Sequence, residues 1–252
     1  MSEIVKDRAV VLRTYPFGES STIAVVLTRT RGKVRLLAKG ARGGRSPFAG
    51  SLRTGNVCEI VFYSREERGL QLVKEIEGAA PLEPPSGDLE RLCLLQAGLE
   101  IVDRSVVERS ADEQLFDLLE TFMRRLSGAV DPWALFFGFE VGVLKLAGSF
   151  PSTRACGRCG RELGAEVFAV DPASGAVTCA ACGDRKARPL SRGAAEALAL
   201  MDRSGFEEAG RSVLAPRERK EIGELIHHVF ENHMDGYRLP YALRLCKGVN
   251  EQ

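Results

Sequence analysis

Two pairs of cysteines constrain the middle of this 252-residue chain more than any other feature. Each pair has the form C-x2-C, and nineteen residues separate the two pairs. This spacing is typical of a structural zinc site in which four thiolates surround one tetrahedral ion. Redox-active pairs and metal-free cysteines are the alternatives. We predict one structural zinc ion, with these four ligands: Cys156, Cys159, Cys179 and Cys182.

The segment between the cysteine pairs is too short to fold on its own. Glu166–Val170 and Gly175–Thr178 have the pattern of a small hairpin joined by a turn. So few residues cannot bury enough apolar surface, and a bound metal would have to contribute the missing stability. Four thiolates also close the coordination sphere, so a catalytic zinc with an open position is not expected. Residues 155–188 are therefore expected to form a zinc-finger insert.

The first 78 residues alternate short β-rich runs with turn signals, as in a small all-β domain. We expect five strands, at roughly Asp7–Tyr15, Ser21–Thr28, Lys33–Lys39, Asn56–Tyr63 and Leu70–Glu77. A five-stranded, partly open Greek-key barrel is the OB-fold, whose second and third strands commonly bind oligonucleotides. The sequence thus predicts an OB-fold β-barrel at residues 1–79.

The net charge of +1, from 35 basic and 34 acidic side chains, hides an uneven distribution. Residues 1–78 carry 14 basic and 8 acidic side chains, whereas residues 79–155 carry 7 and 12. In the third expected strand, two-residue periodicity places the cations on one face, and the glycine-rich loop that follows adds two arginines. A merely solvated face is the alternative, but eight cations with no acid between Arg29 and Arg53 favour a polyanion site. Its predicted residues are Lys33, Arg35, Lys39, Arg42 and Arg45.

From Asp88 onward the apolar residues recur with the period of helices. Ser110 and Glu113 fit a capping box, Asp131-Pro132 fits a helix start, and Trp133–Ala147 is apolar nearly all round. Further helices are expected at Ser191–Ser204 and Pro216–Met234. We predict an α+β multidomain protein in which residues 80–154 and 189–252 form one helical domain around the insert.

Nothing in the sequence assembles an active site, so we expect a protein that is not an enzyme. The three histidines, His227, His228 and His233, fall in one expected helix and are interpreted as surface or helix-end residues. The loop Gly40–Ser46 lacks the G-K-[ST] ending of a phosphate-binding loop. The N-terminus has no secretory signal pattern and no apolar run is long enough to cross a bilayer, which favours a cytoplasmic protein without membrane contact.

Two blocks of the N-terminal region carry a resemblance to a known family. The first is Val10-Val11-Leu12-Arg13-Thr14-Tyr15-Pro16-Phe17-Gly18-Glu19-Ser20-Ser21. The second runs from Gly32-Lys33 to Lys39-Gly40-Ala41-Arg42 and is followed by Ser46 and Leu52. Together with the helical region and the four-cysteine insert, these blocks resemble the bacterial RecO recombination-mediator family over essentially the full length.

The resemblance implies a function in recombinational DNA repair without a covalent step. It implies binding of single- and double-stranded DNA, annealing of complementary strands coated by single-strand binding protein (SSB), and loading of RecA together with RecR. RecR would contact the N-terminal domain, the C-terminal tail of SSB would contact the helical region, and the protein would be associated with the nucleoid. The family's basic DNA surface falls on the same five cations, from Lys33 to Arg45. A zinc-ribbon RNA-binding factor in translation or RNA processing is the alternative function.

Overall fold

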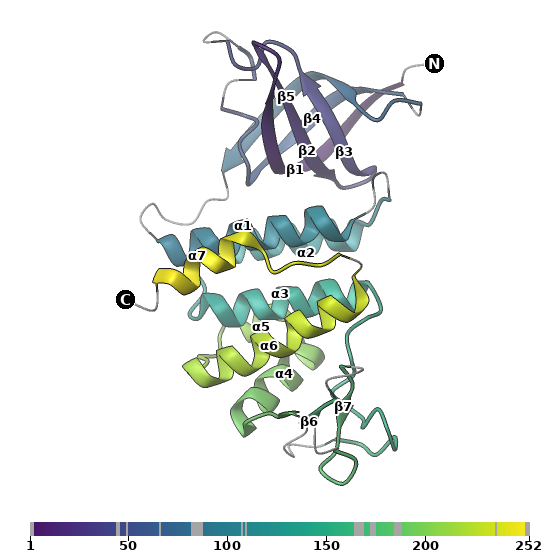
Figure 1. Ribbon diagram of the computed structural model, residues 1–252. Coiled ribbons are helices and arrows are strands. Elements are labelled where there is room, and N and C mark those ends of the chain that lie inside the picture. Colours follow the sequence, from purple (N-terminus) through teal and green to yellow (C-terminus); the bar gives the residue numbers. More distant parts are fainter. Residues whose placement is uncertain are drawn as a thin grey trace. The chain divides into compact units, whose positions relative to one another are not determined.

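The computed structural model describes residues 3–43, 46–48, 50–65, 67–81, 88–106, 108, 110–163, 169–171, 175–183, 188–234 and 236–249. The chain divides into two compact units, one of residues 1–127 with 245–252 and one of residues 128–244 (Figure 1). The boundary falls inside helix α7, Tyr241–Val249. Each unit is described by itself below.

A closed five-stranded barrel forms the N-terminal part of the first unit. Its strands are β1 (Glu3–Phe17), β2 (Ser21–Thr28), β3 (Gly32–Ala38), β4 (Asn56–Ser64) and β5 (Gln71–Pro81). The order around the barrel is β1-β2-β3-β5-β4, and every pairing is antiparallel except that of β3 with β5. This OB-like barrel confirms the expected five strands. The strand β1 is longer than expected because it pairs with both β2 and β4.

The two faces of β3 differ as the two-residue period predicts. Val34, Leu36 and Ala38 are buried inside the barrel, while the residues between them are only partly buried. In β1, the register against β2 shifts between Val11 and Arg13, which indicates a β-bulge. This bulge sets which side chains of the second half of β1 point outward.

Two helices pack with the barrel in the same unit. They are α1, Leu89–Ser105, which contacts β1, and α2, Glu113–Leu126. The predicted capping box of α2 is wrong: the helix is capped by Asp112, whose carboxylate accepts a hydrogen bond from the Leu115 N–H at 3.0 Å. A Cβ added at Gly32 would lie 2.2 Å from the Ser110 carbonyl oxygen, so only glycine fits there. The β2–β3 turn therefore lies directly against the segment that joins α1 to α2.

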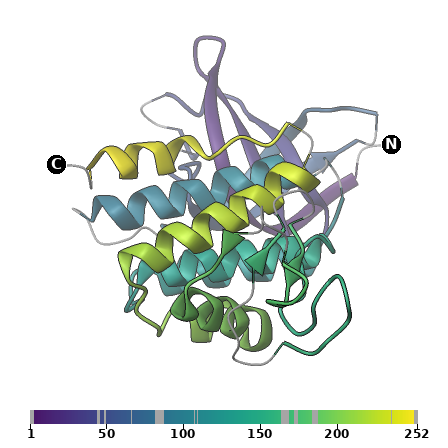
Figure 2. The ribbon, with the colours of Figure 1, turned by 60° about the horizontal axis from the view of Figure 1, so that its bottom comes forward.

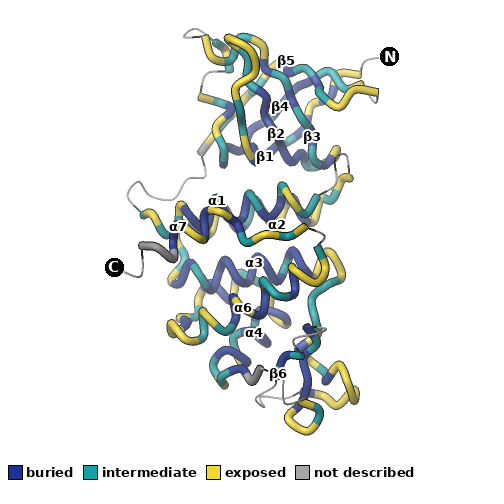
Figure 3. Tube along the Cα trace, viewed as in Figure 1, coloured by how far each residue is buried: buried dark blue, intermediate teal, exposed yellow. Residues whose placement is uncertain are grey.

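The second unit is built around α3, Pro132–Leu146, which is buried along almost its whole length (Figure 3). Its companions are α4 (Arg192–Ser204), α5 (Phe206–Ala209) and α6 (Pro216–His233). All three contact α3, and α6 runs alongside it (Figure 2). The expected helices are confirmed to within a residue or two of their bounds, whereas α5 and α7 were not expected.

Two buried carboxylates hold the loops of this unit. Asp131 caps α3 as predicted and its second oxygen accepts a hydrogen bond from the Leu214 N–H at 2.8 Å. Asp202 on α4 accepts hydrogen bonds from the N–H and the hydroxyl of Thr153, at 3.0 and 2.7 Å. These bonds fix the chain that leads from α3 into the cysteine segment.

The cysteine segment carries three two-residue strands, β6 (Ala169–Val170), β7 (Val177–Thr178) and β8 (Arg188–Pro189). β6 pairs with both β7 and β8 in an antiparallel arrangement. The β6–β7 pairing confirms the predicted hairpin in the residues that the structure describes; Glu166 lies outside them. Among the helices described, none is long and apolar enough to span a membrane.

Candidate nucleic-acid interface and metal centre

The outer face of the barrel presents its side chains in rows that run across β1, β2 and β3. The strand register places Arg13, Val25 and Arg35 in one row and Tyr15, Ile23 and Leu37 in the next row on the same face. A third row begins with Phe17, which pairs with Ser21. Because Ala38 pairs with Thr22, the next residue, Lys39, lies beside Ser21 at the end of this row. As predicted, the cations of β3 share a face, and β1 adds an arginine and two aromatic rings to it.

The helices cover one end of this outer face and neutralise its cations. The Lys33 ammonium is largely buried, 3.6 Å from an Asp103 carboxylate oxygen, and donates a hydrogen bond to the Asp103 carbonyl. Arg13 donates to the other carboxylate oxygen of Asp103 at 2.6 Å. Arg35 lies 4.0 Å from Glu108 and its guanidinium also contacts the Tyr15 hydroxyl. Of the five predicted DNA-contacting side chains, Lys33 is thus engaged and largely covered, whereas Arg35 is partly exposed and only loosely paired.

The acids of α2 engage two further cations of the barrel. Arg8 donates to Glu120 at 2.6 Å, and Arg29 donates to Asp117 at 3.0 Å. The hydrogen bond from Arg8 is the largest effect that holds the pKa of Glu120 below its usual range. These side chains line an open cleft of about 610 Å³ together with Thr121 and Arg124. Because two of its three arginines are paired with its two carboxylates, the cleft presents no uniform attraction for a polyanion.

The other end of the outer face is open. Phe17, Lys39 and Arg42 are exposed there, and the part of the chain that the structure describes supplies no carboxylate partner for either cation. The backbone N–H of Arg42 donates to the Ser20 carbonyl at 2.9 Å, and its guanidinium donates to the Gly18 carbonyl at 3.3 Å. These bonds tie the loop after β3 to the turn between β1 and β2. Arg45 lies outside the described residues.

We name this surface the open corner and define it by Phe17, Lys39 and Arg42. Sequence reasoning found its cations but did not separate them from Lys33 and Arg35, because the covering acids come from residues more than sixty positions away. It also missed Arg13, whose guanidinium lies 5.7 Å from the centre of the Tyr15 ring. The apolar run before Arg13 hides the bulge, so no local pattern shows that this arginine shares the outer face.

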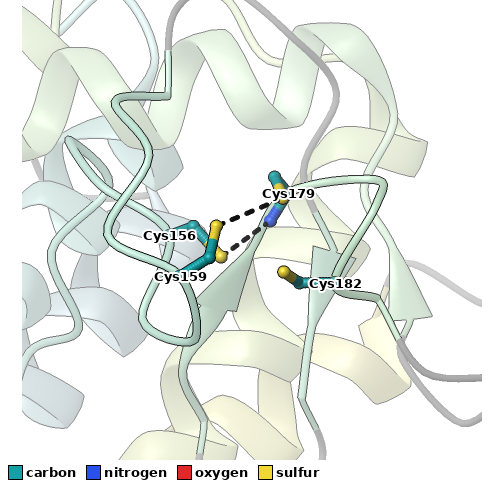
Figure 4. A group of neighbouring side chains, drawn as sticks. All are labelled: Cys156, Cys159, Cys179 and Cys182. Carbon is teal, nitrogen blue, oxygen red and sulfur yellow. Dashed lines mark hydrogen bonds between the residues drawn. The ribbon is translucent and has the colours of Figure 1, made fainter.

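The four cysteines predicted as metal ligands come together in the second unit (Figure 4). Their sulfur atoms all lie within 4.8 Å of one another, and Sγ of Cys159 is 3.9 Å from Sγ of Cys179. Zinc–thiolate bonds of about 2.3 Å in a tetrahedron separate the sulfurs by about 3.8 Å. The donor set and its spacing therefore fit one structural zinc ion.

Backbone hydrogen bonds shape both turns of this centre. The Gly160 N–H donates to the Cys156 carbonyl at 2.8 Å, and the Cys182 N–H donates to the Cys179 carbonyl at 2.9 Å. The Cys179 N–H also donates to Sγ of Cys156 at 3.3 Å, and this bond is the main cause that lowers the pKa of the Cys156 thiol to about 6. A thiol that loses its proton readily suits a metal ligand, because the thiolate is the form that binds.

Comparison with known proteins agrees with both parts of this description. The family model for the N-terminal region of recombination protein O matches residues 1–82, and the model for its C-terminal region matches residues 86–240. The chain belongs to the RecO family of DNA repair proteins. The DNA repair protein RecO of Anaeromyxobacter sp. (strain K) is 32% identical over 240 residues, which cover 93% of each chain.

More distant RecO proteins match over nearly the same length. The DNA repair protein RecO of Chlorobium luteolum is 30% identical and covers 92% of this chain and 93% of its own. That of Moorella thermoacetica is 29% identical and covers 93% and 88%. The family resemblance inferred from the N-terminal blocks is confirmed. RecO is a family of DNA repair mediators rather than of known catalysts.

The histidines of this RecO-family chain are placed differently from expectation in one case. His233 is exposed at the end of α6, as predicted, but His227 is largely buried. Its Nδ1 lies 2.7 Å from the Tyr237 hydroxyl and 3.7 Å from the fully buried carboxylate of Glu140. Burial raises the pKa of Glu140 well above its usual value. Among the described residues neither carboxylate oxygen of Glu140 has a hydrogen-bond partner, and the side chain is fully buried within α3.

Proposed function

We propose that this chain is a recombination mediator that binds single- and double-stranded DNA on its barrel and anneals complementary strands. Membership of the RecO family supports the role in DNA repair. The observation that carries the DNA-binding surface is the open corner, where Lys39 and Arg42 are exposed without a carboxylate partner among the described residues. Of the five predicted DNA contacts, these two supply the accessible charge, Arg35 is a partly exposed cation with Glu108 4.0 Å away, and Lys33 acts mainly within the protein.

The proposed annealing reaction needs positioning and charge neutralisation, and no bond is made or broken in it. Two complementary strands repel each other through their phosphates. Cations at the open corner hold the phosphates of one or both strands and release condensed counterions, which favours binding of the polyanion. Because these contacts are made to the backbone, the base edges remain available for pairing. Binding is therefore expected to tolerate any base sequence.

We further propose the partners that such a mediator requires. Single-strand binding protein covers the strands before annealing, its C-terminal tail contacts the helical region, and RecR contacts the N-terminal barrel. Together with RecR, the protein promotes loading of RecA. This activity places the protein in the cytoplasm, associated with the nucleoid.

The proposed metal is one zinc ion held by the four cysteines. Its role is structural, because four thiolates leave no position for a substrate or for an activated water. Residues 155–188 would act as a zinc finger that depends on the ion for its fold. We propose the following division of the rest of the chain: residues 1–79 bind DNA, and residues 80–154 and 189–252 form the helical part.

The decisive experiment is an annealing assay with two complementary oligonucleotides, each coated with SSB. The rate is followed by energy transfer between dyes on the two strands, with and without the protein. We expect faster annealing of both bare and SSB-coated strands. No acceleration of either, or a preference for structured RNA over DNA of matched length, would overturn the proposed function in favour of an RNA-binding role.

A further inference from the structure

The aromatic side chains of the barrel differ sharply in exposure. Phe62 is 1% exposed and belongs to the barrel core, and Phe48 packs against that core. The Tyr15 ring is half-buried below Arg13, and its hydroxyl contacts Arg35. Phe17, in contrast, is 50% exposed. Its exposure leaves the Phe17 ring accessible to a ligand, and the cations beside it give that accessibility its meaning.

The surroundings of Phe17 suit a nucleobase. It lies at the outward end of β1, opposite Ser21, and Lys39 lies one strand further along the same row. Two strand spacings separate the Phe17 and Lys39 backbones by about 10 Å. Arg42 approaches from the loop, where its guanidinium reaches the carbonyl of Gly18, the residue after Phe17. An exposed aromatic ring thus shares this end of the barrel with two exposed cations, and proteins hold single strands by combining stacking rings with cations for the phosphates.

We propose that Phe17 is a base-stacking residue for single-stranded DNA, with Lys39 and Arg42 on the phosphates to either side. This inference rests on the proposed function and adds a residue that binds by stacking on a base, whereas Lys39 and Arg42 bind phosphates by charge. Stacking uses the face of a base and leaves its pairing edge open, so it is compatible with annealing. In a duplex the base faces are already stacked on their neighbours, so Phe17 contributes to binding of single strands and not of double strands.

The test is an equilibrium titration of the full chain with a dye-labelled single-stranded oligonucleotide, followed by fluorescence anisotropy at several salt concentrations. Phe17→Ala should weaken binding between about fivefold and a hundredfold. Because stacking releases no counterions, the slope of log K against log salt should stay at the wild-type value. Phe17→Trp should retain affinity. Ile4→Ala is the matched control, since Ile4 is 57% exposed at the opposite end of the same strand.

A second oligonucleotide, in which the central nucleotides are abasic, isolates the bases from the backbone. Wild type should prefer the base-bearing strand, Phe17→Ala should lose most of that preference, and binding to duplex DNA should be equal for both. If the wild type binds single strands but Phe17→Ala binds them equally well and keeps its preference for bases, the stacking role is refuted and the proposed function stands. If the wild type binds no DNA at all, both fail.

Discussion

The cations of the barrel should divide into two groups when they are replaced one set at a time. Lys39 and Arg42 are exposed at the open corner, whereas Lys33 is held by Asp103 beneath α1. Replacing the first two by alanine should therefore remove contacts to DNA, and replacing the third should remove a contact within the protein.

Each phosphate contact to a single strand contributes about 0.7 to the slope of log K against log salt. The double variant Lys39→Ala, Arg42→Ala should lower that slope by about 1.4. At 0.1 M salt this corresponds to binding that is weaker by about 25-fold. Neither side chain has a carboxylate partner in the described part of the chain, so the double variant should unfold at the wild-type temperature.

Lys33→Ala should behave in the opposite way. Its loss breaks a charged hydrogen bond that is largely screened from water, at a cost of about 1–2 kcal/mol in the free energy of unfolding. Arg13 remains on Asp103, so the carboxylate is not left without a partner. The salt slope should stay within error of wild type. Equal slopes for the double variant and wild type, or a lower slope for Lys33→Ala alone, would refute the distinction between the open and the covered ends.

Two further predictions concern the second unit. Replacing Cys156 and Cys179 together by serine should abolish zinc binding, measured by elemental analysis of the purified protein, and should lower the melting temperature. The control variant Cys58→Ser, in the barrel, should keep one zinc ion per chain. A wild-type protein free of zinc would contradict the assignment. Glu140→Gln should stabilise the protein near pH 7, because burial raises the pKa of Glu140 and the folded state keeps a proton that the unfolded chain releases above about pH 4.3. The free energy of unfolding of wild type should therefore fall relative to that of Glu140→Gln as the pH rises above about 4.3, by at most about 1.4 kcal/mol per pH unit. Parallel pH profiles of the two proteins in chemical denaturation would contradict this.

Local patterns predicted much of the architecture because the barrel and the helices obey simple periodicities. The alternation of Val34, Leu36 and Ala38 placed β3 correctly, and Asp131 before a proline marked the start of α3. The cysteine spacing alone correctly predicted that the four sulfur atoms lie close together. At α2 the local signal misled, since Asp112 and Ser110 are both good capping residues. In the structure Asp112 caps the helix, and the backbone of Ser110 packs against Gly32 instead.

What the sequence did not predict depends on contacts between distant segments. Asp103 and Glu108 approach the barrel only after α1 and the chain behind it have packed, so no pattern near Lys33 or Arg35 signals that these cations are occupied. The bulge in β1 likewise places Arg13, Tyr15 and Phe17 on the outer face, although the apolar run before Arg13 looks regular in the sequence. Charge counts therefore located the proposed DNA-binding region, and the packing of α1 distinguishes its exposed cations from its covered ones.

Lysine footprinting of the wild-type protein tests whether DNA binds at the open corner rather than at the covered end of the barrel. An amine-reactive reagent is applied with and without a single-stranded oligonucleotide, and the modified positions are quantified by mass spectrometry. The account predicts that Lys39 reacts in the free protein and is protected by DNA, while Lys33 reacts poorly in both states and the exposed Lys6 reacts equally in both. Unchanged reactivity of Lys39 in the presence of saturating DNA, or protection of Lys6 instead, would contradict it.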